Sequence, residues 1–444
     1  MKKIFLVTIF VLLSAAAWGS GFGVFTQGAN GLGQANAVVA HPTGPSSLYF
    51  NPALLNQVKG RQVEVGTTGI YADRSIDLDS GGSEDADNQW NFPSTFYYTH
   101  QANDTLTSGI GIFFPFGLSS KWDDDYEGRY IGTEGDVLTM NINPVLSVQV
   151  TDKLSLAAGF DLLYMDATLK NKLNQTAAYA IAYPQLSEFF PNLPLPGSVI
   201  FNDIDQEFNG DGWGAGYNLG VLYQLTERIS LGATYRSHID VDIQGDVDLD
   251  NVDPALAVLF PEGNADADIR LPAQAAAGIA VQALDQLIVE VGVRWEDWSS
   301  TDELKIEFDQ PILGQSTNVI PRDWRSTWTY NVGGQFQIND TVALNAGYLY
   351  GQNAVPSDTF EPIIPDTDAH LFTVGTNLTF GPWTVSGAFG WEHHEDRDKT
   401  NTIGDPLGSA VASQIAGQPV TVGTANGEYQ TDIYLVALSV GYAF

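Results

Sequence analysis

The end of the chain, from Asp432 to Phe444, alternates between two kinds of side chain. One set is apolar and has aromatic residues at both ends: Tyr434, Val436, Leu438, Val440, Tyr442 and Phe444. The other set is smaller and more mixed: Ile433, Leu435, Ala437, Ser439, Gly441 and Ala443. A period of two indicates a β-strand with two different faces. An apolar face with aromatic ends suits a strand that meets lipid along its middle and headgroups at its ends. The pattern predicts the closing strand of an outer-membrane β-barrel; an edge strand of a soluble β-sandwich is the alternative.

Similar segments recur along the rest of the chain. Fourteen of them are predicted as strands, at residues 61–73, 89–100, 105–122, 136–150, 153–172, 212–225, 228–246, 268–283, 287–308, 324–338, 342–353, 368–379, 383–395 and 429–444. We therefore expect an all-β transmembrane barrel of about fourteen antiparallel strands.

The connections between these strands alternate in length. The short ones carry turn-forming residues and lie at 101–104, 151–152, 226–227, 284–286, 339–341 and 381–382. The long ones lie near 74–88, 123–135, 173–211, 247–267, 309–323, 354–367 and 396–428. Short turns on one side and long loops on the other are typical of outer-membrane barrels, in which the short turns face the periplasm. An even number of strands places both chain ends on the short-turn side.

The beginning of the chain has the pattern of a secretion signal. Two lysines precede an apolar stretch at 4–17, and small residues at 17–19 offer a cleavage site before Ser20. The residues that follow alternate little and are rich in Gly, Ala and Asn. We predict three parts: a signal peptide at 1–19, a compact N-terminal segment at 20–60 that can fold up into the lumen, and the barrel at 61–444.

Composition excludes several classes of protein. The 444 residues contain 19 Lys and Arg against 53 Asp and Glu, which gives a net charge of -34 and argues against nucleic acid as a partner. The chain has no Cys, so it can form neither a disulfide nor a thiolate metal site. The mean hydropathy of -0.06 is too low for a helical membrane protein and fits an alternating barrel.

Much of the negative charge falls in the predicted long loops, for example at 77–87 and 123–125. We interpret it as a solvated surface; the alternative is that divalent cations bridge these loops to the phosphorylated lipopolysaccharide outside. Asp246, Asp248 and Asp250 resemble the start of a calcium loop, but Asn251 stands where the turn needs Gly. His393 and His394 lack the spacing of a metalloprotease site. We therefore predict no metal site, no cofactor and no catalytic residue.

Two of the long loops are unusually apolar. One carries Tyr179, Phe189 and Phe190 within 177–195, and the next carries the stretch 254–261. Apolar side chains in exposed loops need a partner. Either the two loops pack on each other, or they form a landing surface for an apolar ligand.

An ordered series of short motifs resembles the FadL family of outer-membrane long-chain fatty acid transporters, which includes relatives that take up aromatic hydrocarbons. The resemblance covers essentially the whole mature chain, and its ordered series is more specific than any single motif. The motifs are Ser20-Gly21-Phe22, Gly31-Leu32-Gly33, Asn51-Pro52-Ala53, Phe116-Gly117-Leu118, Gly128-Arg129-Tyr130, Asn143-Pro144, Lys153-Leu154-Ser155-Leu156, Asp211 with Trp213, Asn218-Leu219-Gly220, Tyr235-Arg236-Ser237, Leu271-Pro272, Trp295 with Trp298-Ser299, Val355-Pro356 and Pro365-Asp366 with Asp368.

The resemblance implies a fourteen-stranded barrel that is plugged by a small hatch. A hydrophobic molecule would be captured between two extracellular loops and passed to a lumen pocket that the tip of the hatch contacts. A kink in the third strand would leave a side opening in the wall. The residues that match these features are Tyr179, Phe189, Phe190, Leu256, Leu259 and Phe260 in the loops, Phe22 at the hatch tip, Asn51, Pro52 and Ala53 in the hatch, and Pro115 and Gly117 at the bend.

The substrate class depends on the charges in the lumen. Alternation directs Arg236, Arg294 and Arg325 inward, and an unpaired arginine would bind the carboxylate of a fatty acid. Arg294 has Glu290 and Glu296 near it on the same face and could be paired with one of them. We predict passive uptake of long-chain fatty acids by a monomer in contact with outer-membrane lipid and lipopolysaccharide. A channel for neutral hydrocarbons is the first alternative, and an outer-membrane barrel hydrolase is the second.

Overall fold

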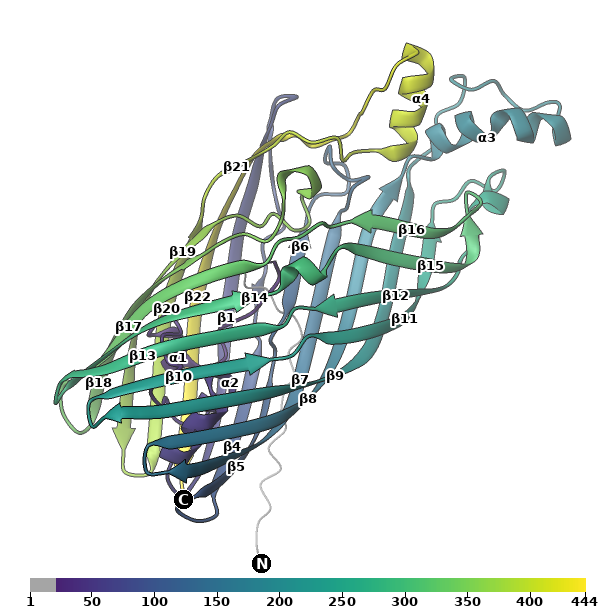
Figure 1. The fold of residues 1–444 in the computed structure, drawn as a ribbon. Helices are drawn as coiled ribbons and strands as arrows, with labels where there is room; N and C mark the ends of the chain where they lie inside the picture. The colour runs from purple at the N-terminus through teal and green to yellow at the C-terminus, as the bar shows by residue number, and fades with distance from the viewer. Residues whose placement is uncertain (1–20) are drawn as a thin grey trace, which may run out of the picture.

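The last strand of the chain closes a barrel in the computed structural model, which describes residues 21–444 (Figure 1). This strand, β22 (Gly427–Ala443), pairs antiparallel with the first strand, β1 (Arg61–Leu78), along almost its whole length. The first and last strands thus satisfy each other's backbone groups, as a wall inside lipid requires. The predicted signal peptide at 1–19 lies outside the described residues.

Twenty-two strand segments join into one sheet and line up as fourteen spans of the wall. In order, the spans are β1; β2 (Ser83–Asp85), β3 (Trp90–Asn91) and β4 (Ser94–Gln101); β5 (Leu106–Phe113) and β6 (Gly117–Lys121); β7 (Glu134–Thr151); β8 (Leu154–Leu173); β9 (Ile204–Thr226); β10 (Ile229–Arg236) and β11 (Ile239–Asp250); β12 (Gly263–Leu271) and β13 (Gln274–Leu284); β14 (Leu287–Glu296) and β15 (Glu303–Ile312); β16 (Gln315–Pro321) and β17 (Thr327–Gln337); β18 (Val342–Gly351); β19 (Ala369–Phe380); β20 (Trp383–His394) and β21 (Arg397–Lys399); and β22. The predicted class and strand number are confirmed.

The two faces of the wall differ in the way the alternation predicts. On β22, Val436 and Leu438 are 50% and 52% exposed, whereas Leu435 and Ala437 are 0% and 3% exposed. Large aromatic side chains are exposed on the outer face toward both ends of the wall, and they include Trp213, Tyr217, Trp328, Trp391, Phe336, Phe380 and Trp383. The outer face is therefore an apolar band with aromatic margins.

Several spans are interrupted where the sequence predicts continuous strands. The third span stops at Phe113 and resumes at Gly117, and the ninth is broken by the short helix η3 (Trp298–Ser300). Pro272 lies in the break between β12 and β13, where a residue without an N–H cannot donate to the sheet. Propensity alone misses most of these breaks, because the residues on either side keep the pattern of a strand.

One predicted long loop is wrong. Residues 309–323 form a tight hairpin, because β15 continues to Ile312 and β16 begins at Gln315. The two turn residues, Leu313 and Gly314, have φ angles of 51° and 77°. Positive φ at both central positions is the geometry of a two-residue hairpin turn, which keeps the strands in the twist of the sheet.

The remaining long loops gather at the end of the barrel opposite the C-terminus (Figure 1). Two helices stand there, α3 (Gln175–Phe189) and α4 (Pro406–Ala416), and they contact each other. Shorter helical turns in the loops are η2 (Ala257–Leu259) and η4 (Ser357–Thr359). Within residues 21–444, no helix has the length and apolar character needed to cross a membrane.

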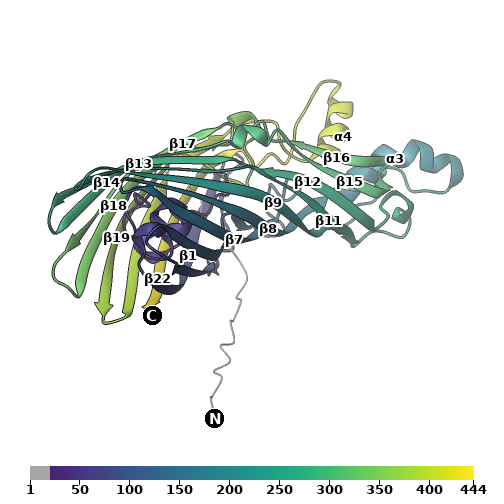
Figure 2. The ribbon, with the colours of Figure 1, turned by 60° about the horizontal axis from the view of Figure 1, so that its bottom comes forward.

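The N-terminal segment, residues 21–60, lies inside the ring of strands, where Figure 2 shows it in purple. It contains α1 (Ala29–Leu32), α2 (Ser47–Phe50) and η1 (Pro52–Gln57), and nearly all of its side chains are buried. Its backbone touches the wall where the wall carries glycine. A Cβ added at Gly232 would lie 2.0 Å from the carbonyl oxygen of Val39, and one at Gly333 would lie 2.0 Å from that of Gln34.

Substituting Leu438 by Arg tests the assignment of the lipid face. Leu438 lies on the outer face between the aromatic residues Tyr434 and Tyr442. We expect the Arg variant to lose roughly 2–4 kcal/mol of unfolding free energy, because a charge near the bilayer midplane is costly. Gln430→Arg, which is exposed on the same strand beyond Tyr434, should cost about 0–1 kcal/mol. Urea titration in lipid vesicles measures both, and equal costs would contradict the assignment.

Substituting Gly333 by Ala tests the close approach of the N-terminal segment. We expect a loss of about 1–3 kcal/mol in unfolding free energy, because the added methyl group overlaps the Gln34 carbonyl. Gly387→Ala is the matched control, since a Cβ at that wall position meets nothing within 4 Å. The two variants are compared by urea titration, and a Gly333→Ala protein as stable as the control would show that the segment does not pack there.

Candidate functional site

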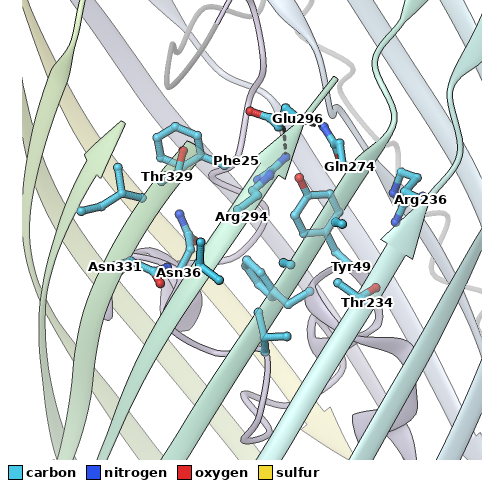
Figure 3. Close-up of a pocket in the computed structure, with 16 residues that line it drawn as sticks. Phe25, Asn36, Tyr49, Thr234, Arg236, Gln274, Arg294, Glu296, Thr329 and Asn331 are labelled. Atoms are coloured by element: carbon cyan, nitrogen blue, oxygen red, sulfur yellow. Dashed lines mark hydrogen bonds and ion pairs between the residues drawn. The ribbon is translucent and has the colours of Figure 1, made fainter. Parts of the chain in front are cut away.

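A cavity lies between the N-terminal segment and one side of the wall (Figure 3). Its free volume is about 60 Å³. The N-terminal segment contributes Phe25, Asn36, Val39, Tyr49 and Phe50, and the wall contributes Thr234, Arg236, Gln274, Ala275, Ala276, Val293, Arg294, Glu296, Thr329, Asn331 and Leu349. The lining is mostly apolar, with a few polar groups at fixed places, as in sites for small molecules.

Arg236, at the end of β10, lines this cavity but is paired. Its guanidinium forms an ion pair with Asp161, which is fully buried on β8. Asp161 also accepts hydrogen bonds from the side-chain amides of Asn141 and Asn218. The arginine lies beside the rings of Tyr49 and Phe113, at 5.6 and 5.2 Å from their centroids. Its charge is thus compensated within the protein.

Arg294, on β14, is also paired. Its Nη2 atom lies 2.9 Å from Oε1 of Glu296, which accepts a second hydrogen bond of 2.8 Å from Gln274. Glu290, the other predicted neighbour, points elsewhere: it accepts hydrogen bonds from the N-terminal segment at Val39 N, Ala40 N and the His41 ring.

Arg325 does not line the cavity. It lies between β16 and β17, and its backbone N–H donates to Ala354 in a loop. The three predicted arginines therefore do not form one site: two of them border the cavity, and the third lies at the level of the long loops.

Phe22 lies deep in a cluster of aromatic rings. Its ring centroid is 4.9 Å from that of Trp298, 5.9 Å from that of Trp324 and 6.1 Å from that of Phe116. The two tryptophans come from the breaks in the ninth and tenth spans of the wall. These breaks bring large side chains inward to the place where the N-terminal segment begins.

The same segment covers the interruption in the third span. The Gly117 N–H donates to the carbonyl of Phe22, and the Val24 N–H donates to that of Pro115, so residues 22–24 pair with the broken strand. Pro115 lies inside the break and Gly117 begins β6. The wall opening that a broken strand would leave is filled here by the N-terminal segment.

Asn51 holds η1 against the wall. Its side-chain oxygen caps the helical turn at Ala53 N, and its amide nitrogen donates to the carbonyls of Val39 and Val221. Pro52 follows at the first position of the turn, where a missing N–H costs nothing. The three residues Asn51, Pro52 and Ala53 thus form a structural anchor rather than part of the cavity lining.

The two apolar loops contact each other, and part of their apolar residues are buried in the same large cluster. Tyr179, Leu256 and Phe260 are buried, and Leu259 is half-buried. The Gln175 side chain joins the loops, because it donates to the carbonyls of Asn202 and Asn251 and accepts from Asp253 N.

Other apolar residues of these loops are left uncovered. Phe189 and Phe190 are 77% and 58% exposed, and Val258 is 78% exposed. The loops therefore have both features that the sequence left open, a packed interface and an apolar surface.

Sequence reasoning found Arg236, Arg294 and Glu296 but missed Asn36 and Tyr49 in the cavity and Asp161 beside it. Asn36 and Tyr49 lie in the segment without periodicity, and Asp161 is spaced like any inward residue of a strand. The left-handed backbone of Asn36, with φ of 59°, suits asparagine, but a single Asn in a Gly-rich segment does not predict it. Only the meeting of distant segments identifies these residues.

Asp366, in the loop before β19, binds the start of the N-terminal segment. Its carboxylate accepts hydrogen bonds of 3.0 Å from Gly21 N and 2.6 Å from Ala354 N. Burial raises the pKa of Asp366 from 3.8 to about 6, although these two backbone N–H groups and the nearby His394 and Arg397 act to lower the pKa. The contact is therefore sensitive to pH in a range just below neutral.

The Asp366→Asn variant tests this burial. A pKa raised in the folded state means that the folded chain binds more protons than the unfolded chain between about pH 4 and 6, so the unfolding free energy falls as the pH rises through this range. The asparagine side chain can still accept both hydrogen bonds but does not titrate. We therefore expect the variant to lose a pH-dependent change of ~2–3 kcal/mol in unfolding free energy. Urea titrations at pH 4.5 and 7 measure it, with the exposed turn variant Asp104→Asn as the control. An unchanged slope in Asp366→Asn would contradict the assignment.

The fold and site define a class of protein: a β-barrel with an apolar outer band that holds its own N-terminal segment in the lumen. A family model for outer membrane protein transport proteins (OMPP1/FadL/TodX) matches residues 10–444. The chain belongs to this family, and it is a multi-pass protein of the Gram-negative outer membrane.

The relatives match the chain at low identity over most of its length. Outer membrane protein P1 of Haemophilus influenzae is 25% identical over 483 residues, which cover 100% of both chains. The long-chain fatty acid transport protein of Escherichia coli K12 is 24% identical over 83% of this chain and 86% of its own length.

Solved structures share the fold. A Pseudomonas aeruginosa FadL homologue superposes with a TM-score of 0.82 and 22% identity over 96% of this chain and 100% of that chain. The Pseudomonas putida toluene transporter TodX superposes with a TM-score of 0.69 and 17% identity over 94% of this chain and 98% of that chain. At these identities the likeness is one of architecture.

Proposed function

We propose that the protein carries hydrophobic compounds, such as long-chain fatty acids or hydrocarbons, passively across the outer membrane. One observation carries the proposal: a membrane-type barrel of this family encloses an N-terminal segment with a mostly apolar cavity beside it. Relatives named as a long-chain fatty acid transport protein and a toluene transporter support it.

The route begins at the loops on the side opposite the short turns. The exposed Phe189, Phe190 and Val258 are the first apolar contacts for a ligand that leaves water. Burial gains about 0.8 kcal/mol per CH₂ group, so a ten-carbon chain gains several kcal/mol after ordering costs. The buried Tyr179, Leu256 and Phe260 and the half-buried Leu259 hold this surface in place. Capture of this kind needs no energy source.

Residues 20–60 act as the hatch in this proposal. Phe22 and residues 22–24 cover the break in the third strand, so movement of this segment would open both the lumen and the wall at Pro115 and Gly117. The segment packs its apolar side chains against the wall and is also held by hydrogen bonds from its backbone, such as those to Glu290 and Asp366, which a shift of a few ångströms can break.

The surroundings of the barrel also belong to the proposal. The apolar band meets outer-membrane lipid, and the acidic loops lie at the level of lipopolysaccharide. We place the protein there as a monomer. Transport rather than catalysis is the activity, and the relatives named as a long-chain fatty acid transport protein and a toluene transporter support it.

Uptake into lipid vesicles that contain the purified protein tests the function. We expect toluene and oleic acid to enter faster than into protein-free vesicles, without ATP or a membrane potential. Ala276→Phe should reduce uptake at least about tenfold, because Phe fills a cavity with only about 60 Å³ of free volume. Ala158→Phe, on the exposed outer face, is the matched control and should transport normally. Equal rates with and without protein would refute the proposal, and hydrolysis of an ester substrate instead would favour an enzyme.

A further inference from the structure

The cavity contains a buried amide that has no partner. Asn36 is 7% exposed, and neither its Oδ1 nor its Nδ2 atom has a hydrogen-bond partner among residues 21–444. It lines the cavity from the N-terminal segment (Figure 3). A buried polar group without a partner is costly, and native proteins leave few of them. The amide offers one acceptor and one donor to whatever occupies the cavity.

A second polar group faces the same space. The Tyr49 side chain is 7% exposed and lines the cavity. Its hydroxyl lies beside the Arg294 guanidinium and has no hydrogen bond of normal geometry within the described part of the chain, so it is open to a ligand. Most of the lining surface around them is apolar and includes Phe25, Val39, Phe50, Val293 and Leu349. Asn331 also lines the cavity, but its Nδ2 atom already donates to the Ala35 carbonyl and only its Oδ1 atom lacks a partner. Polar groups at a few places in a mostly apolar site are complementary to a ligand with a single polar group and an apolar body.

The charged groups beside the cavity determine which kind of polar group fits. Arg236 is neutralised by Asp161, and Arg294 by Glu296, so the two arginines and their two partners sum to zero formal charge. An anionic head group would lie close to Glu296 and would compete with it for Arg294. Removing one partner from a buried ion pair leaves an uncompensated charge, which is strongly unfavourable. An uncharged head group meets neither penalty.

The size of the cavity limits the ligand further. A free volume of about 60 Å³ corresponds to about five water-sized groups. This is room for a hydroxyl-bearing head and a few carbon atoms, or for a small ring after slight expansion. A longer apolar tail would have to displace part of the N-terminal segment.

We propose, on the basis of the transport function above, that this cavity is a selectivity site for uncharged amphiphiles, in which Asn36 and Tyr49 bind a head group that both donates and accepts a hydrogen bond. An alcohol, a phenol or an unionised acid has such a group. A hydrocarbon forms no hydrogen bond with Asn36 or Tyr49, and a carboxylate is repelled by the carboxylate of Glu296.

Three probes of similar shape separate these cases: benzyl alcohol, benzoate in its ionised form at pH 8, and toluene. Their binding to the detergent-solubilised full chain is measured by titration calorimetry with empty micelles subtracted. We expect benzyl alcohol to bind the wild type more tightly than either of the others. Asn36→Gly, which keeps the left-handed backbone available, should weaken the binding of benzyl alcohol about fivefold to tenfold. Tyr49→Phe should weaken this binding about fivefold. Toluene binding should change less than about twofold in both.

Matched controls come from the same residue types outside the cavity. Asn251→Gly replaces an asparagine with φ of 66° in a loop, and Tyr330→Phe removes a hydroxyl from a residue that is 50% exposed on the outer face. Neither should alter the binding of the three probes. Heat-modifiable mobility on a gel checks the folding of every variant, and Tyr49→Phe, which removes one oxygen atom, carries the test if Asn36→Gly does not fold.

Several results would overturn the proposal. These are benzoate binding as tightly as benzyl alcohol, the three probes weakening alike in the cavity variants, or no measurable binding of benzyl alcohol. A crystal structure with benzyl alcohol in which only water contacts Asn36 would do the same. If the vesicles still take up toluene in any of these cases, only the head-group selectivity fails; if the wild type takes up nothing, the transport function itself fails.

Discussion

Closure of the sheet is the constraint on which the rest of this structure depends. Inside a bilayer no water is available to the backbone, so every N–H and C=O of the wall must find its partner within the protein. The pairing of β1 with β22 meets this requirement across the ends of the chain. It also dictates that side chains alternate between lipid and lumen, and therefore that one set is apolar and the other is free to carry chemistry.

A closed wall of fourteen spans creates a second problem, because its interior is wider than side chains alone can fill. The N-terminal segment occupies this space. Inward glycines such as Gly232 and Gly333 let its backbone approach the strands closely, and wall carboxylates such as Glu290 accept hydrogen bonds from its N–H groups. These backbone contacts and polar anchors add to the packing of its buried apolar side chains against the wall.

The breaks in the wall connect this packing to the proposed transport. A broken strand exposes unpaired backbone groups, and residues 22–24 satisfy those of the third span. Breaks in the ninth and tenth spans turn Trp298 and Trp324 inward against Phe22. The tip of the N-terminal segment, the side of the barrel and the lumen are therefore coupled through a single aromatic cluster, and displacement of Phe22 would affect all three.

The sequence by itself was enough to predict the barrel, its number of spans and the face of the last strand that meets lipid, because a period of two is a local property that the bilayer imposes on each strand separately. The sequence also showed the resemblance to a transporter family, because its short motifs occur in the same order as in that family. It did not predict the tight hairpin at Leu313 and Gly314, and it named Glu296 only as one of two candidate partners of Arg294, two residues along the same strand. The pairing of Arg236 with Asp161 and the meeting of Asn36 with Tyr49 in one cavity were decided by the tertiary structure, because residues far apart in the chain become neighbours only when the sheet closes around the N-terminal segment.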